Sequence, residues 1–163
     1  MEPLQELALR CAELLVQRGW TLGLAESCTG GLLGHLITNL PGSSAYFVGD
    51  IVSYADSVKR DLLGVPDSLL RSCGAVSEPT ARAMAGGARR TLDVDVALSI
   101  TGIAGPAGGM PDKPVGTVYI GIATPLGQAV RHFVWDRDRE GNKQLSAGAA
   151  LQLLIDTLQE RGD

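Results

Sequence analysis

The sequence is poor in cysteine, aromatic residues and lysine, and it has no long apolar run. Its three cysteines are widely separated, a spacing that matches neither a disulfide framework nor a CxxC metal motif. We therefore expect a reducing, cytoplasmic setting. No apolar stretch reaches the roughly 18 residues that span a bilayer, and the acidic first residues do not resemble a signal peptide. No membrane association is expected.

Basic residues are neither abundant nor clustered. The formal net charge is −4, and aromatic residues make up only 4% of the chain. A nucleic-acid-binding surface would gather Lys and Arg side chains on one face, so we expect no nucleic-acid partner. Arg is common, whereas Lys occurs only as Lys59, Lys113 and Lys143. A chain with this preference has retained lysine at very few positions.

The length of 163 residues predicts one domain, residues 1–163, whose core needs no disulfide or metal. Apolar residues at helical spacing predict a first helix that Gly19 ends. Buried runs predict strands at 21–25, 51–54, 94–100, 115–123 and 129–135. Helices are expected at 30–40, around Lys59, from a Ser77 cap to Leu92, and from after a polar connection at 136–142 to about Leu158. Asp56 or Ser57 is the expected N-cap of the Lys59 helix.

The glycine-rich loop from Gly102 to Gly109 is too short for a crossover helix, which makes the last strands antiparallel neighbours. The sequence therefore predicts an α/β fold with a mixed parallel and antiparallel sheet flanked by helices. Homo-oligomers through an exposed helix or an edge strand are compatible with this architecture. The same loop can cradle a phosphate in a backbone nest, or it can be a plain hairpin connection. Asp93 and Asp95 flank a strand start and read as solvated, so no metal site is predicted.

Small hydroxyl residues and paired glycines lie where the strand 21–25 leads into the next helix. Ligands of open α/β sheets bind beyond the carboxyl ends of strands, and N–H groups at a helix start favour anions. Ser27 is therefore a candidate nucleophile, with amides near Thr29 and Gly30 holding an oxyanion. An equally open alternative is that Thr29 is only the N-cap of the helix and that Gly30 and Gly31 allow close packing. The GxSxG elbow is absent, so this is not an ordinary α/β-hydrolase.

A serine nucleophile needs a base, and both histidines are poorly placed. His35 lies two helical turns beyond Ser27, about 12 Å along the axis, and His132 alternates with valines on an edge strand. Lys59 begins the helix after the second strand, whose end converges with that of the first. A buried neutral amine is a workable base, whereas arginine cannot lose its proton. The alternative is a solvated lysine beside Arg60.

Six segments together resemble the nicotinamide-nucleotide amidase (PncC) family, also known as the C-terminal domain of competence/damage-inducible CinA proteins. They follow one another in the family's order and cover nearly the whole chain. The segments are Leu24-Ala-Glu-Ser-Cys-Thr-Gly-Gly31, Pro41-Gly-Ser-Ser-Ala45, Val52-Ser-Tyr-Ala-Asp-Ser-Val-Lys59, Gly74-Ala-Val-Ser-Glu78, Thr101-Gly-Ile-Ala-Gly-Pro106 and Lys113-Pro-Val-Gly-Thr117.

The resemblance implies deamidation of nicotinamide mononucleotide to nicotinate mononucleotide and ammonia, a step of pyridine-nucleotide salvage in bacteria. It implies a small-molecule nucleotide substrate and neither a metal nor an organic cofactor. By resemblance, Ser27 is the nucleophile that forms an acyl-enzyme, Lys59 the base and Tyr54 the motif tyrosine. Expected substrate contacts are Thr29, Gly30, Gly31, Ser43, Ser44, Thr101, Gly102 and the loop from Gly105.

The sequence departs from the family pattern at two acidic positions. Asp56 stands where relatives often have Asn, and Asp50 stands where they often have the second glycine of a pair. A carboxylate three residues before Lys59 favours the protonated amine and weakens it as a base. The alternative functions are therefore a non-catalytic nucleotide-binding or competence-related interaction module, and an amidase for another small amide. The resemblance is to the C-terminal domain, so no activity of a full-length CinA protein's N-terminal domain is inferred.

Overall fold

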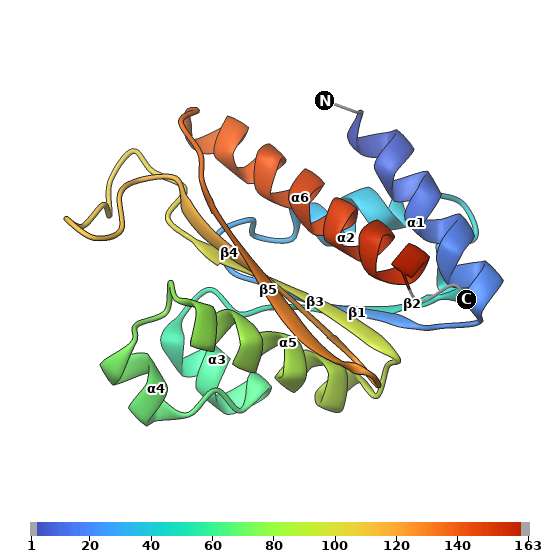
Figure 1. Ribbon diagram of the computed structural model, residues 1–163, viewed down its shortest axis with the longest axis horizontal. Coiled ribbons are helices and arrows are strands. Elements are labelled where there is room, and N and C mark those ends of the chain that lie inside the picture. The colour runs from blue at the N-terminus through green and yellow to red at the C-terminus, as the bar shows by residue number, and fades with distance from the viewer. Residues whose placement is uncertain (1–2, 161–163) are drawn as a thin grey trace.

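A five-stranded mixed sheet separates two layers of helices (Figure 1). The computed structural model describes residues 3–160. The spatial order is β2-β1-β3-β4-β5, with β1 parallel to both β2 and β3, and β4 antiparallel to both β3 and β5. This confirms the predicted mixed α/β sheet and its antiparallel last strands. The strands are β1 (Leu22–Glu26), β2 (Phe47–Val52), β3 (Val96–Gly102), β4 (Thr117–Thr124) and β5 (Gly127–Val134).

Three helices cover each face of the sheet, and a short 3₁₀ helix, η1 (Ser43–Ala45), precedes β2 (Figure 1). One layer contains α1 (Leu4–Arg18), α2 (Leu32–Thr38) and α6 (Arg139–Glu160). The other contains α3 (Asp56–Leu63), α4 (Asp67–Ser72) and α5 (Glu78–Leu92). No helix within residues 3–160 is both long enough and apolar enough to cross a membrane.

The two faces of the sheet are packed differently. Leucine and isoleucine side chains fill the larger core, beneath α1, α2 and α6. On the other face, α5 presents small residues, so its backbone comes close to α3. A Cβ on Gly87 would lie 1.9 Å from the Leu63 carbonyl oxygen, so only glycine permits this approach. The contact fixes α3, the helix that carries Lys59, against α5.

Several predicted boundaries are wrong, and the backbone explains them. The helix expected at 30–40 begins only at Leu32, because Gly30 and Gly31 have φ angles of 61° and 105°. The strand expected at 51–54 is Phe47–Val52, and the polar connection expected at 136–142 includes the first turn of α6. The helix α4 and η1 were not predicted.

The caps gave one confirmed prediction and one wrong one. Ser77 caps α5 as expected, since its hydroxyl accepts a hydrogen bond from the Thr80 N–H at 3.3 Å. The N-cap of α3 is Ala55, which has no side chain that can cap, rather than Asp56 or Ser57. Asp56 is therefore not the N-cap of α3, and its side chain is exposed at the surface.

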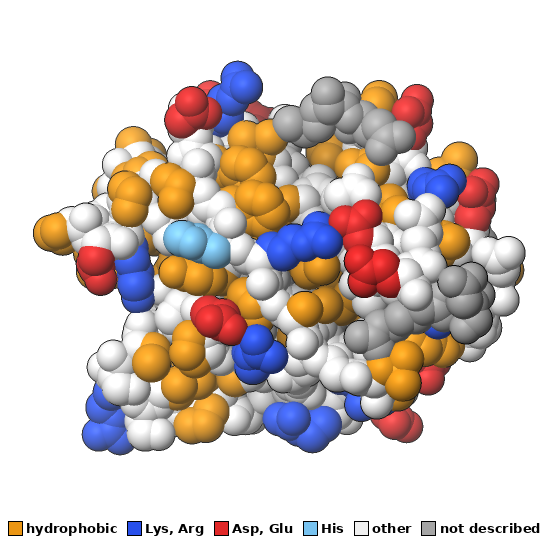
Figure 2. Space-filling view, viewed as in Figure 1, with side chains coloured by type: hydrophobic (Ala, Val, Ile, Leu, Met, Phe, Trp, Pro, Cys, Tyr) orange, Lys and Arg blue, Asp and Glu red, His pale blue; other side chains and the backbone are white. Residues whose placement is uncertain are grey.

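The face drawn in Figure 2 has basic and acidic side chains interspersed with apolar ones. The exposed apolar side chains of the molecule include Leu126 and Val134 at the two ends of β5. Within residues 3–160, no group of His, Cys, Asp and Glu side chains is arranged to hold a metal ion.

Candidate active site

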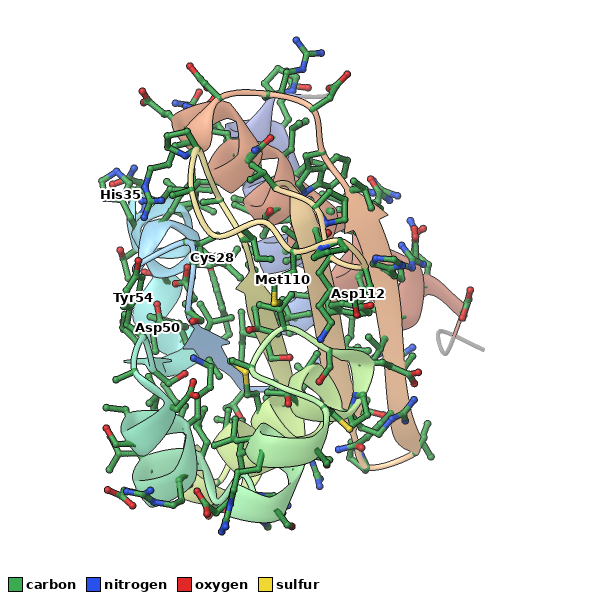
Figure 3. All side chains as sticks on the ribbon, turned by 90° about the vertical axis from the view of Figure 1, so that its left-hand side faces the viewer. Cys28, His35, Asp50, Tyr54, Met110 and Asp112 are labelled. Atoms are coloured by element: carbon green, nitrogen blue, oxygen red, sulfur yellow. The ribbon has the colours of Figure 1, made fainter. Side chains whose placement is uncertain are left out.

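Ser27 lies immediately beyond the carboxyl end of β1. The next residue, Cys28, is labelled on the side of the molecule that faces the viewer in Figure 3. Its N–H donates to the Ile100 carbonyl on β3 at 2.9 Å, which extends the parallel pairing by one residue. Its carbonyl accepts from the Gly30 N–H at 3.1 Å and closes a tight turn. The side chain is thereby fixed at the edge where β1, β2 and β3 end, and it is 7% exposed.

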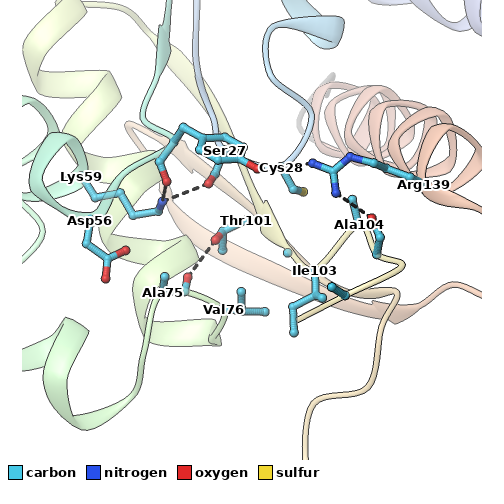
Figure 4. A pocket seen from close by; sticks show the side chains of 14 residues that line it. Ser27, Cys28, Asp56, Lys59, Ala75, Val76, Thr101, Ile103, Ala104 and Arg139 are labelled. Carbon is cyan, nitrogen blue, oxygen red and sulfur yellow. Dashed lines mark hydrogen bonds between the residues drawn. The ribbon is translucent and has the colours of Figure 1, made fainter. Parts of the chain in front are cut away.

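Lys59 reaches Ser27 from α3 through the interior of the protein. It is only 1% exposed, and it is among the largest fully buried side chains. Its Nζ lies 2.9 Å from Ser27 Oγ (Figure 4). It also donates to the carbonyls of Ser53 at 2.7 Å and Tyr54 at 3.0 Å. The approach of Lys59 to Ser27 expected from the sequence is therefore present in the fold, and the solvated-lysine alternative is excluded.

Burial has a direct electrostatic consequence for Lys59. Desolvation lowers the pKa of the amine below its usual 10.5, while the Asp56 carboxylate and Cys28 act in the opposite direction. Within residues 3–160, the ion pairs of the protein do not include Lys59. The hydrogen-bond partners of Lys59 are thus uncharged, and desolvation is the largest influence on its pKa.

Cys28 also borders the candidate site, directly after Ser27. Burial raises the pKa of its thiol to about 11, against an ordinary value of 9.0. The nucleophilic form of cysteine is the thiolate, which this environment suppresses at neutral pH. Of the two adjacent candidates, Ser27 is the one with a base in contact.

A pocket of about 250 Å³ opens above the Ser27–Lys59 pair. Thr101 borders it and donates to the Ala75 carbonyl at 2.8 Å, which ties β3 to the segment before α5 (Figure 4). Six residues predicted from the sequence line this pocket: Ser27, Tyr54, Lys59, Thr101, Gly102 and Gly105. The others that line it are Cys28, Asp56, Ala75, Val76, Ile103, Ala104, Ala107 and Arg139.

Arg139, in the first turn of α6, is the basic residue of the pocket that sequence analysis missed. Its Nη1 donates to the Gly105 carbonyl at 2.6 Å, and its Nη2 donates to the Tyr54 hydroxyl at 3.3 Å. It lies in the segment 136–142, which the sequence predicted to be a polar connection, and it belongs to none of the motifs found in the sequence. Only the packing of α6 across the sheet brings this guanidinium to the rim of the pocket.

Five predicted contact residues lie outside the pocket lining. Ser43 and Ser44 form η1, which leads into the amino end of β2, whereas the pocket lies at the carboxyl ends of the strands. Thr29 donates its hydroxyl to Glu26 at 2.5 Å. Gly30 and Gly31 form the turn before α2, and the Gly30 N–H is engaged by Ser27, so it cannot serve as the expected oxyanion donor.

Neither histidine lines the pocket, in agreement with the rejection of a Ser-His-Asp triad. His35 is exposed and contacts the Asn39 side chain at 3.1 Å. His132 stacks on Tyr119, with ring centroids 4.4 Å apart. The basic side chain in contact with Ser27 is that of Lys59.

Fold and site together define an α/β domain with a buried serine–lysine pair under a small polar pocket. The chain belongs to the family described as the CinA C-terminal domain, whose model matches residues 4–158. This confirms the resemblance on which the sequence analysis relied.

Relatives agree with this assignment. The chain is 50% identical over 148 residues to a CinA-like protein of Synechocystis, covering 91% of this chain and 35% of the relative. It is 55% identical over 130 residues to a CinA-like protein of Geobacter metallireducens, covering 78% of this chain and 32% of the relative. The chain thus spans about a third of the length of these curated relatives.

Solved structures give the same result. A competence-damaged protein (CinA) superfamily protein from Klebsiella pneumoniae superposes with a TM-score of 0.94 at 31% identity, covering 98% of this chain and 99% of that one. The competence/damage inducible protein CihA from Agrobacterium tumefaciens gives 0.90 at 38% identity, covering 98% of each chain.

Proposed function

We propose that this domain is an amidohydrolase that converts nicotinamide mononucleotide to nicotinate mononucleotide and ammonia through a serine acyl-enzyme. The observation that carries the proposal is the 2.9 Å contact between the buried Lys59 amine and the Ser27 hydroxyl. The family resemblance supplies the substrate and the reaction. The geometry around Lys59 supports the mechanism.

The contacts of Lys59 match the hydrogen-bonding capacity of a neutral amine. A neutral amine has two N–H donors and one lone pair. The carbonyls of Ser53 and Tyr54 take the two donors, which leaves the lone pair for the Ser27 hydroxyl proton. After proton transfer the ammonium has three donors for the same three oxygens. Neither state leaves an unpaired hydrogen-bonding group, so the proton can move without rearrangement.

The reaction then proceeds in two halves. Ser27 Oγ attacks the carboxamide carbon as its proton passes to Lys59, and the resulting ammonium protonates the departing nitrogen, which leaves as ammonia. A water molecule, activated by the neutral Lys59, cleaves the ester and releases the carboxylic acid. The N–H of the residue after a nucleophile is a common oxyanion donor, and here that residue is Cys28.

The pocket suits a small amide that carries an anionic group. Val76 and Ile103 offer apolar surface to a pyridine ring. Arg139 places a cation at the rim, where its planar donors match a phosphate. The phosphate of a mononucleotide is therefore assigned to Arg139 in this proposal, rather than to Ser43 or Ser44.

Asp56 favours a second candidate, a domain that binds the nucleotide without hydrolysing it. Its carboxylate borders the pocket and raises the pKa of Lys59, which opposes the neutral base. Desolvation is the larger influence and acts toward the neutral form. The balance of these two causes supports the amidase over the binding module.

The two candidates are separated by product analysis and calorimetry on the same sample. The amidase releases ammonia and nicotinate mononucleotide in equal amounts from nicotinamide mononucleotide, and less from nicotinamide riboside, which lacks the phosphate. Binding of the mononucleotide without ammonia release would reject the amidase and leave the binding module.

A further inference from the structure

Glu26, directly before Ser27, ties together the loop that carries the nucleophile. It is fully buried, and its carboxylate accepts three hydrogen bonds. The donors are the Thr29 hydroxyl at 2.5 Å and the N–H groups of Leu33 and Gly34, each at 3.0 Å. One side chain therefore joins the end of β1 to the first turn of α2. Three donors are typical of an ionised carboxylate.

A second carboxyl group, that of Asp50, lies against Glu26. Asp50 on β2 is in register with Leu24 of β1, and side chains two residues apart on a strand share a face. Asp50 and Glu26 thus both face α2, and both carboxyl groups lie against Gly34, whose N–H donates to Glu26 Oε2 at 3.0 Å. A Cβ on Gly34 would lie 2.5 Å from Asp50 Oδ2, so the α2 backbone closes tightly over the pair.

The surroundings of Asp50 do not suit a second negative charge. Its Oδ1 is buried with no hydrogen-bond partner within residues 3–160. The ion pairs of this part of the chain do not include Asp50. From β1 it faces Glu26, and from α2 it meets the backbone of Gly34, whose N–H donates to Glu26. The side chain of His35, also on α2, contacts that of Asn39.

Proton sharing resolves this arrangement. A neutral Asp50 has an O–H that donates to the Glu26 carboxylate, which removes the repulsion between two buried charges. Burial and the Glu26 charge raise the pKa of Asp50 to about 9, while the Gly34 N–H acts against them. Figure 3 shows Asp50 on the same side of the molecule as His35 and Tyr54, toward the α2 and β2 edge.

We propose that Asp50 is a positioning residue that acts through Glu26: as a neutral acid it donates its proton to the Glu26 carboxylate and so holds the Ser27 loop in place. Loss of that proton sets two carboxylates against each other behind the nucleophile. The expected effect on turnover rests on the proposed amidase function. The shared proton itself does not, and it is measurable without any substrate.

Thermal unfolding against pH tests the shared proton. A group whose pKa is higher in the folded state stabilises the fold at low pH, and this contribution declines as pH rises through the folded pKa. For Asp50 the decline runs from about pH 4 to about pH 9. Asp50→Asn keeps an N–H donor but does not titrate.

The Tm of Asp50→Asn minus that of the wild type should therefore grow by about 3 °C for each pH unit between pH 5 and pH 8. Asp136→Asn, at a carboxylate whose side chain is 96% exposed, should give a difference independent of pH. A pH-independent difference for Asp50→Asn would overturn the proposal.

Turnover tests the positioning role. Asp50→Ala should lower kcat about fivefold with little change in KM, the effect of losing one hydrogen bond of about 1 kcal/mol. Asp50→Asn should restore kcat and keep it above pH 9, where the wild type declines. Equal losses in both variants would refute positioning by the donated proton. A wild type without amidase turnover would refute the proposed function instead, and the unfolding series would still decide the shared proton.

Discussion

Two ionisable side chains, the buried Lys59 and the partly buried Asp50, lie on opposite sides of the end of β1: Lys59 beside Ser27, and Asp50 beside Glu26. Burial acts on both in the same sense, toward the neutral form, so it lowers the pKa of the amine and raises that of the acid. Their partners differ. Lys59 meets two carbonyls and a hydroxyl, whereas Asp50 meets another carboxyl group.

This difference in partners suits the two side chains to different roles, one in proton transfer and the other in fixing the Ser27 loop. A neutral amine whose N–H groups are both engaged has its lone pair directed at Ser27, which suits a base. A neutral acid has a proton to donate, which suits the fixing of a neighbouring carboxylate. Consecutive residues at one strand end thus face opposite sides of the sheet: Glu26 faces Asp50 beneath α2, and Ser27 faces Lys59 of α3. The strand's alternation of side chains makes both possible.

The largest effect is expected when the proposed nucleophile beside Lys59 is removed. Ser27→Ala should reduce deamidation by at least about 10³-fold, because no acyl-enzyme can form. Its Tm should remain close to that of the wild type. Ser43→Ala, at a serine outside the pocket, is the matched control and should keep full activity in ammonia-release assays. Near-normal turnover by Ser27→Ala would contradict its role as nucleophile.

The next largest effect is expected when Lys59 is replaced by a residue that cannot lose its proton. Lys59→Arg should lower kcat by about 10²- to 10⁴-fold, since the guanidinium stays charged. Lys113→Arg, the same substitution at a lysine that donates to the Cys73 carbonyl, should have little effect. Steady-state kinetics of both variants measure the difference. Comparable activities would show that Lys59 is not the base.

The rim of the pocket should matter for binding more than for chemistry. Arg139→Ala should raise KM for nicotinamide mononucleotide about tenfold or more, the value of a charge-assisted hydrogen bond, with a smaller change in kcat. The preference over nicotinamide riboside should shrink accordingly. Arg137→Ala, at an exposed neighbour, serves as the control. An unchanged preference would remove Arg139 from phosphate recognition.

The smallest expected effect is that of Asp56 on the pKa of Lys59. Asp56 raises the pKa of Lys59, so Asp56→Asn should lower it and move the rising limb of kcat/KM to lower pH. A shift of less than about one pH unit is expected for a carboxylate exposed to solvent. Asp61→Asn on the same helix should leave the limb in place. A shift to higher pH would reverse the assigned influence of Asp56.

Local sequence patterns predicted most of the fold. The strand runs, the Gly19 end of α1 and the Ser77 cap depend on neighbours in the chain, and the structure contains them. The α2 start was misplaced because two glycines at positive φ delay the helix, and a glycine pair is also compatible with close packing inside a helix. The amino end of β2 was missed because the strand is only partly buried.

The site was predictable where motif residues follow strand ends. Ser27 and Thr101 lie at the carboxyl ends of β1 and β3, and Lys59 lies in α3, the helix that follows β2. The three strands adjoin in a parallel arrangement. Arg139 and Asp50 were not predictable as partners. The contacts of Arg139 depend on how α6 packs across the sheet, and the position of Asp50 beside Glu26 depends on the pairing of β2 with β1. Both are properties of the tertiary structure that no local spacing records.

Acylation of the enzyme tests the central claim most directly. Wild-type protein mixed with nicotinamide mononucleotide would be quenched in acid and digested, and its peptides examined by mass spectrometry. The serine–lysine mechanism predicts a nicotinate ribonucleotide acyl group on Ser27, absent from Ser27→Ala. An acyl group on Cys28 instead, or one that persists in Ser27→Ala, would contradict it.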